Sequence, residues 1–97
     1  MKTEVLIEEQ PRAFIQRQPP DARKQLRQAL HALANGGVFP ELLEDELEGF
    51  YKLKVGRHRL ILRMDSSRAR PRFKVVFAER RKVVYELFSQ ILGLEQS

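Results

Sequence analysis

Polar and apolar residues alternate along Phe50–Met64 (FYKLKVGRHRLILRM), on both sides of a turn that contains a glycine. Alternation with a period of two is typical of strands that have one buried face. A two-residue turn with glycine first, here Gly56-Arg57, is a common connection between antiparallel strands. The pairs that this turn predicts are Val55 with His58, Lys54 with Arg59, Leu53 with Leu60, Lys52 with Ile61 and Tyr51 with Leu62. The stretch therefore predicts a β-hairpin.

The two faces of this hairpin differ in chemistry, because successive side chains of a strand point to opposite sides. One face carries Tyr51, Leu53, Val55, Leu60, Leu62 and Met64; the other carries Lys52, Lys54, Arg59 and Arg63. We expect the first face to build the core and the second to gather cations. Lys54 directly opposite Arg59 destabilises the strand pair unless an anion lies between them. The alternative is that these long side chains simply extend into water from a half-exposed sheet.

The segments before the hairpin predict one strand and two helices. Thr3–Glu8 is a short β-branched and apolar run, which favours a strand. Pro11 suits the first turn of a short helix, and Pro19-Pro20 ends it. A second helix begins near Asp21 and ends at Asn35-Gly36-Gly37, which supplies left-handed residues. Its apolar residues follow the spacing of one helix face: Leu26, Ala29, Leu30 and Leu33.

Residues 38–48 mix leucines with a run of acids, and we interpret them as a connecting loop whose leucines dock onto the core. The acids are Glu41, Glu44, Asp45, Glu46 and Glu48. A catalytic carboxylate is one possibility, with Glu46 or Glu48 nearest the hairpin. A run of this kind is usually a solvated surface.

After the hairpin, the sequence predicts a polar turn at Asp65–Pro71, a strand at Arg72–Ala78 and a helix that Gly93 ends. The core face of the strand should carry Phe73, Val75 and Phe77, with Lys74 on the opposite face. The helix carries an apolar stripe of Val84, Leu87, Phe88 and Ile91. The predicted fold class is α+β: an N-terminal strand, two helices, a three-stranded antiparallel meander and a C-terminal helix. The length of the chain predicts a single domain over residues 1–97 with one core.

Charge is divided unevenly along the chain. Residues 1–48 hold 6 Lys/Arg and 9 Asp/Glu, net −3, whereas residues 49–97 hold 12 and 4, net +8. A concentrated positive field favours an anionic partner, with nucleic acid the commonest and an acidic protein the next.

Composition also excludes several kinds of chemistry. The chain has no cysteine and two histidines, which excludes disulfides and thiolate sites and argues against a zinc site or a two-histidine ribonuclease. We assign His31 to the solvated face of its helix and His58 to a partly buried position at the turn. No apolar run approaches the ~20 residues that cross a bilayer, and acids interrupt the first apolar stretch. We therefore expect a cytoplasmic protein with no cofactor, no metal and no membrane contact.

Two short motifs of this sequence resemble motifs of the RelE/ParE toxin superfamily of bacterial toxin–antitoxin systems, and they occur in the same order as in that superfamily. The first is the hairpin LEGFYKLKVGRHRLIL, and the second is ERRKVVYELF, which follows the next strand. The resemblance covers nearly the whole chain and implies the same strand, two-helix, three-strand order. It also implies a cognate antitoxin as partner, whose apolar helix or strand would cover the sheet and neutralise the basic face.

In the ribonuclease branch of that superfamily, RelE-like toxins cut mRNA in the ribosomal A site without metal, using residues of the sheet face. By resemblance, the catalytic set here is Lys52, Lys54, Arg59, Arg81 and Tyr85. Many members have histidine in the closing motif where this sequence has Arg80, so that general acid or base is lacking. The cations expected to contact the RNA backbone, or only to aid solubility, are Arg57, Arg63, Lys74, Arg80 and Lys82.

RNA cleavage by the 2′-hydroxyl needs a base, cations for the charge of the phosphorane and a proton donor for the leaving oxygen. Positive charge nearby makes a neutral lysine easier to form, so Lys54 facing Arg59 is the candidate base. Arg59 and Arg81 would grip phosphate oxygens through their planar donor forks. Tyr85 would stack on a base or assist proton transfer, or else only pack at the edge of its helix.

Three functions are compatible with this charge distribution and these motifs. The first is an endoribonuclease acting on translated mRNA. The second is a ParE-type toxin that binds DNA gyrase and cuts no RNA. The third is a catalytically inert relative that only binds an antitoxin.

Overall fold

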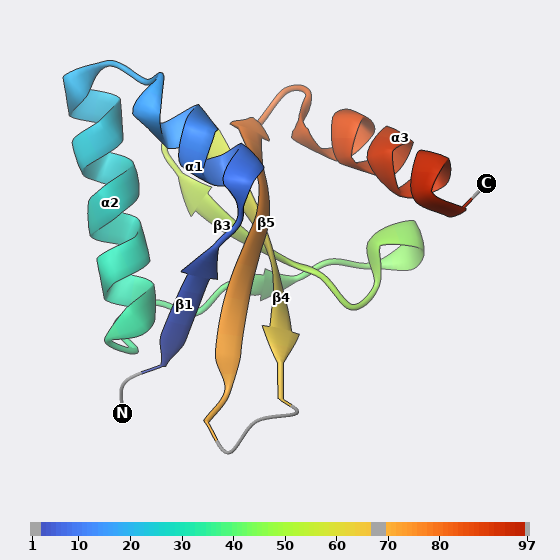
Figure 1. Ribbon diagram of the computed structural model, residues 1–97, viewed down its shortest axis with the longest axis horizontal. Helices are drawn as coiled ribbons and strands as arrows, with labels where there is room; N and C mark the ends of the chain where they lie inside the picture. The colour runs from blue at the N-terminus through green and yellow to red at the C-terminus, as the bar shows by residue number, and fades with distance from the viewer. Residues whose placement is uncertain (1–2, 67–69, 97) are drawn as a thin grey trace.

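The computed structural model describes residues 3–66 and 70–96. Its elements, in chain order, are β1 (Glu4–Ile7), α1 (Glu9–Gln16), α2 (Pro20–Ala34), β2 (Glu41–Leu42), β3 (Tyr51–Val55), β4 (His58–Asp65), β5 (Arg72–Arg80) and α3 (Val84–Gln96). A 3-10 turn, Asp45–Leu47, lies between β2 and β3. The predicted α+β order is confirmed (Figure 1). Of the predicted polar turn, residues 67–69 lie outside the described residues.

The described residues form a five-stranded sheet in the order β1-β5-β4-β3-β2. β1 runs parallel to β5, and the other neighbouring strands are antiparallel. The predicted meander β3-β4-β5 is confirmed, and so is the register of the hairpin. The observed pairs are Tyr51 with Leu62, Lys52 with Ile61, Leu53 with Leu60, Lys54 with Arg59 and Val55 with His58.

Strand β2 was not predicted, because its two residues lie in the segment interpreted as a loop. Glu41 pairs with Lys52, and Leu42 pairs with Tyr51. The leucines of this segment behave differently from one another. Leu47 is buried and Leu43 packs beside it, as predicted, whereas Leu42 is 65% exposed at the edge of the sheet. The expectation that all of these leucines dock onto the core is therefore wrong for Leu42.

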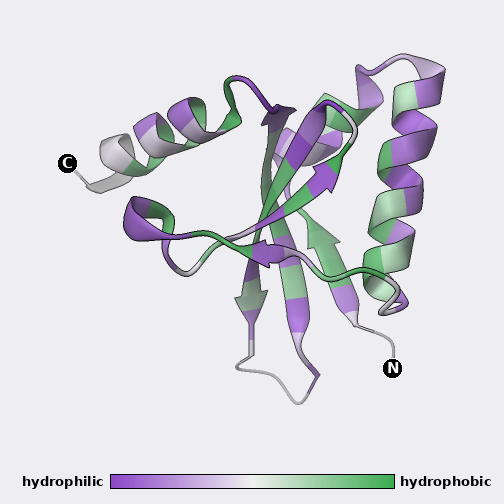
Figure 2. Cartoon of the chain, turned by 180° about the vertical axis from the view of Figure 1, so that it is seen from behind, coloured by the Kyte–Doolittle hydropathy of each residue, from purple (hydrophilic) through white to green (hydrophobic). Residues whose placement is uncertain are grey.

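Helices α1 and α2 cover one face of the sheet and build the larger core (Figure 1). They contribute Phe14, Ile15, Leu26, Leu30 and Leu33, which pack against Leu53, Val55, Leu60, Leu62, Phe73, Val75 and Ala78 of the strands. Hydrophilic and hydrophobic residues alternate along α2, as its predicted spacing requires (Figure 2). Burying each large apolar side chain stabilises the fold by about 1.5–3 kcal/mol.

The opposite face of the sheet carries a second apolar cluster, so the expectation of a single core is wrong. Leu47, Ile61, Phe77, Val84 and Phe88 are buried there under α3. The rings of Phe50 and Phe88 meet edge to face at 5.0 Å between centroids. The cationic face of the hairpin is therefore partly covered by the C-terminal helix, which lies across the sheet from α2 (Figure 1).

A β-bulge in β5 explains where the second core comes from. Leu62 pairs with Val75 and Ile61 pairs with Phe77, which leaves Val76 as an extra residue. Because a bulge breaks the two-residue alternation, Phe77 points to the face opposite Phe73 and Val75. The prediction that all three share one core face is therefore wrong for Phe77.

Helix α3 continues past the glycine that was expected to end it, since Gly93 lies within Val84–Gln96. A single glycine in a helix costs only about 1 kcal/mol relative to alanine, which packing can offset. Of the predicted stripe, Val84 and Phe88 are buried, while Leu87 and Ile91 are each 37% exposed. Among the described helices, none is both long and apolar enough to cross a bilayer.

Candidate active site on the sheet

Lys52 and Tyr85 meet on the face of the sheet under α3. Lys52 lies on β3, and its Nζ is 5.9 Å from the centroid of the Tyr85 ring in the first turn of α3. Within about 6 Å, an ammonium is attracted to the face of an aromatic ring. Tyr85 also packs against the second core, which fixes the start of the helix. The structure thus brings together two predicted catalytic residues from separate motifs.

Lys54 and Arg59 lie opposite each other as predicted, but their charged groups point to different partners. The Nη1 atom of Arg59 donates hydrogen bonds to the carbonyl oxygens of Gly56, at 2.9 Å, and His58, at 2.8 Å. The guanidinium therefore folds back over the hairpin turn. The side chain of Lys54 is 53% exposed and extends toward β2.

Glu41, and not Glu46 or Glu48, is the acid that lies beside the hairpin lysines. Its carboxylate lies 3.8 Å from Nζ of Lys52 and 3.4 Å from Nζ of Lys54. The carboxylate of Glu41 therefore offsets part of the positive charge of this face. Both lysines share the single carboxylate, which β2 places beside them through the pairing of Glu41 with Lys52. The sequence signal for this contact would have been a short extended stretch, Glu41–Leu42, able to pair with the first strand of the hairpin.

The acids that the sequence placed nearest the hairpin lie elsewhere. Glu46 belongs to the 3-10 turn, Glu48 follows it, and both are exposed. Among the described residues, neither forms an ion pair with Lys52 or Lys54. These two acids behave as the solvated surface that was the alternative interpretation.

A second acid lies on the other side of Arg59. Glu79 of β5 pairs with Arg59 in the register, so the two side chains share a face of the sheet. Its Oε2 accepts a hydrogen bond of 2.8 Å from the backbone N–H of Arg80. The cationic face is thus flanked by a carboxylate on each side, one from β2 and one from β5.

Arg81 reaches the same turn from the end of β5. Its backbone N–H donates a hydrogen bond of 2.8 Å to the carbonyl oxygen of Arg57. The carbonyls on either side of Arg57 are those that Arg59 binds. Arg59 and Arg81 are therefore both anchored at the hairpin turn, and the side chain of Arg81 is exposed to solvent.

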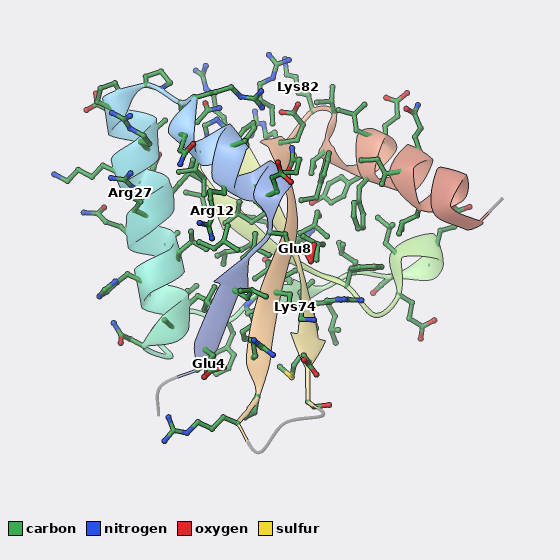
Figure 3. All side chains as sticks on the ribbon, in the orientation of Figure 1. Glu4, Glu8, Arg12, Arg27, Lys74 and Lys82 are labelled. Atoms are coloured by element: carbon green, nitrogen blue, oxygen red, sulfur yellow. The ribbon has the colours of Figure 1, made fainter. Side chains whose placement is uncertain are left out.

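The five cations predicted to contact RNA do not form one surface. Arg63 and Lys74 pair with each other on the cationic face, and Lys74 lies 4.0 Å from Asp65. Arg80 pairs with His58, so it faces the α1 and α2 side. The remaining two are exposed in turns: Arg57 at the hairpin tip and Lys82 before α3 (Figure 3).

His58 occupies the partly buried position expected of it. Its ring meets the ring of Phe14 in α1 edge to face, with centroids 5.4 Å apart. Burial lowers the pKa of His58 below 6.5; Glu79 opposes this shift and Arg80 adds to it. Burial therefore shifts the protonation equilibrium of His58 toward the neutral imidazole.

The fold is similar to that of solved toxin structures. A chain of the RelBE2 toxin–antitoxin complex from Mycobacterium tuberculosis superimposes with a TM-score of 0.70 at 19% identity, over 84% of this chain and 100% of that one. The YoeB/ParE toxin from Agrobacterium tumefaciens gives 0.60 at 16% identity, over 81% and 99%. The YoeB dimer from Staphylococcus aureus gives 0.59 at 18% identity, over 84% and 99%. The fold expected from the RelE/ParE resemblance is therefore confirmed.

Comparison of the sequence with protein-family models finds no match, and comparison with curated proteins finds none either. The similarity to RelE- and YoeB-type toxins accordingly rests on the fold and on the two short motifs.

Proposed function

We propose that this protein is the toxin of a toxin–antitoxin pair and an endoribonuclease that cuts mRNA on the ribosome without a metal ion. The observation that supports the proposal is that Lys52 and Tyr85, from the two separate motifs, meet on the sheet face. Lys54, Arg59 and the backbone of Arg81 lie at the same hairpin. The RelE- and YoeB-type fold supports the same function. We place the protein in the cytoplasm, where translated mRNA is found.

The reaction is an attack of the RNA on itself. The 2′-oxygen forms a bond to the adjacent phosphorus while a base takes its proton, and the bond from phosphorus to the 5′-oxygen breaks. The departing oxygen then takes a proton, which leaves a 2′,3′-cyclic phosphate and a 5′-hydroxyl end. The protein must supply a base, positive charge near the phosphorane and a proton donor.

Two side chains compete for the role of base, Lys54 and Glu41. A carboxylate is ready to accept a proton at neutral pH, and Glu41 lies between the lysines that would bind the phosphate. We assign the base to Glu41 and phosphate binding to Lys52 and Lys54. Lys54 is the base expected from the sequence. It takes this role if the scissile phosphate displaces Glu41 from its ion pairs with the two lysines.

The two arginines act on the developing charge. Nη1 of Arg59 is engaged by the turn, but a guanidinium has five N–H donors, so others can reach a phosphate oxygen. The backbone of Arg81 is anchored to Arg57 and its side chain is exposed, so the guanidinium can turn toward the same phosphate. Tyr85 stacks on a neighbouring base and gives or holds the proton of the leaving oxygen.

The partner that restrains such a toxin is an antitoxin encoded beside it. Its acidic segment would cover the cationic face and neutralise the charge of the two lysines. High salt should then weaken the complex, because salt screens the attraction between exposed charges of opposite sign.

The proposal is tested by inducing the protein alone and mapping the 5′ ends of cellular mRNA, with Arg81→Ala as the matched variant. Because the Arg81 side chain is exposed, the variant should fold and lose toxicity. New mRNA ends should be absent from cells that express it. Full toxicity in both Arg59→Ala and Arg81→Ala would exclude this site.

A second candidate is a ParE-type toxin that binds DNA gyrase, because one structure of similar fold is described as a YoeB/ParE toxin. This function predicts arrested replication and a DNA-damage response with intact mRNA. An inert relative predicts neither effect, with antitoxin binding retained. The induction experiment therefore separates all three functions.

A further inference from the structure

A groove lies between α2 and the β3–β4 turn, on the α1 and α2 side of the sheet. Its volume is about 600 Å³. Lys24, Gln25 and Gln28 of α2 form one wall, and Arg57 and His58 form the other. The two walls approach closely at the base, where a Cβ added to Gly56 would lie 3.2 Å from Oε1 of Gln25.

The groove continues along the outer surface of α2 as a row of basic side chains. A second depression of about 330 Å³ shares Lys24 and Gln28 with it and is also lined by Arg23, Arg27 and His31. Residues four apart on a helix lie on one face, about 6 Å apart along the axis. Arg27 lies midway along α2 (Figure 3). The row therefore runs along one side of the helix.

The charge of this groove differs from that of the sheet face. Lys52 and Lys54 share the carboxylate of Glu41. By contrast, within the described ranges 3–66 and 70–96, no ion pair involves the four cations of the groove. These cations are Arg23, Lys24, Arg27 and Arg57. Among the residues that the structure describes, Asp21 is the one acid that lines either depression. The groove therefore keeps its positive charge in the isolated protein.

The side chains present suit a phosphate backbone. Lysine and arginine neutralise phosphates, and side-chain amides such as those of Gln25 and Gln28 donate hydrogen bonds to phosphate and sugar oxygens. The groove also adjoins the active-site cluster at one point. Arg57 lines it, and the carbonyl of Arg57 accepts the hydrogen bond from the backbone of Arg81.

We propose that this groove binds the phosphate backbone of RNA, as a second contact outside the cluster of Lys52, Lys54 and Tyr85. An RNA chain held at Arg81 would pass over the hairpin tip and follow α2 toward His31. The proposal rests on the proposed function for the identity of the anion, but binding in the groove requires no cleavage. An acidic segment of a partner protein is the competing occupant.

The test compares two variants that each remove two positive charges. Arg23→Gln with Arg27→Gln neutralises the groove, and Arg17→Gln with Arg70→Gln neutralises exposed cations that line neither depression. The probe is a 2′-O-methyl RNA of about 16 nucleotides, which lacks the attacking hydroxyl and cannot be cut by this mechanism. Its affinity is measured between about 50 and 200 mM salt.

We expect the groove variant to bind this RNA roughly tenfold more weakly at low salt, with the slope of log affinity against log salt reduced by about 1.5. The control variant should bind like the unmodified protein. Equal losses in both variants would mean that only net charge matters, and no loss in the groove variant would likewise overturn the proposal. If a polyglutamate peptide needs Arg23 and Arg27 while RNA does not, the groove belongs to a protein partner.

Cross-linking gives a readout that does not depend on affinity. The chain has no cysteine, so Gln28→Cys accepts a single photoreactive label in the groove, and Gln16→Cys places one on α1 as control. Label at position 28 should cross-link the RNA, and label at position 16 should not. If the unmodified protein binds RNA but the label at position 28 does not cross-link to it, the proposal for the groove is overturned and the proposed function stands. Absence of any RNA binding or cleavage would overturn the proposed function as well.

Discussion

The ammonium of Lys52 lies 5.9 Å from the ring centroid of Tyr85, a contact that joins the central hairpin to the C-terminal helix. Lys52 is also 3.8 Å from Glu41 at the edge of the sheet. One lysine thus connects the three elements that border the proposed active site.

Replacing Tyr85 separates stacking from proton transfer. Tyr85→Phe keeps the aromatic face and removes the hydroxyl, so we expect RNA affinity to remain and the cleavage rate to fall about 10²-fold or more. Tyr85→Ala should lower both. Single-turnover cleavage and binding of 2′-O-methyl RNA measure the two effects. A Tyr85→Phe protein that cuts at the normal rate would restrict Tyr85 to stacking.

Replacing Glu41 by glutamine should change binding and cleavage in opposite directions. The neutral amide no longer repels phosphate or occupies Lys52 and Lys54, so affinity for RNA should rise. The cleavage rate should fall about 10²-fold or more, because the base is lost. Glu46→Gln is the matched control, since Glu46 is exposed and pairs with neither lysine. An unchanged or faster rate in Glu41→Gln would return the role of base to Lys54.

Two glycine-to-alanine replacements should change stability with opposite signs. Gly56 has φ 58° and lies against Gln25, so Gly56→Ala should destabilise the protein by about 1–2 kcal/mol. Gly93 lies inside α3, with open space within 4 Å of the point that an alanine Cβ would occupy, so Gly93→Ala should stabilise it by about 0.5–1 kcal/mol. Denaturant unfolding measures both. A stabilising Gly56→Ala would contradict the left-handed turn.

Stability should rise with pH just below neutrality because of His58. Its folded pKa is lowered from 6.5, so between the folded pKa and 6.5 the unfolded chain binds more protons than the folded one. The free energy of unfolding therefore falls as pH falls through this window. Above pH 6.5, His58 no longer makes the free energy of unfolding depend on pH. Denaturant midpoints at several pH values should show the slope, and His58→Gln should flatten it. The slope must persist in His31→Gln if His58 is its source.

Local patterns predicted much of this structure because they depend on residues close together in the sequence. The alternation around Gly56 predicted both the pairing of Lys54 with Arg59 and the buried face of the hairpin. Helix α2 likewise followed from the spacing of Leu26, Leu30 and Leu33. In these elements the period of the backbone and the preference of apolar side chains for burial lead to the same result.

Contacts between distant segments required the folded chain. The bulge at Val76 turned Phe77 to the other face, which an alternating pattern cannot indicate because one extra residue has no sequence signature of its own. In the sequence, Glu41 is one acid of a run of five, and only the pairing of β2 with β3 shows that it lies beside Lys52 and Lys54. Residue types revealed that cations and a tyrosine were present, whereas pairing across the sheet determined which of them share an anion, which meet at the turn and which face α2.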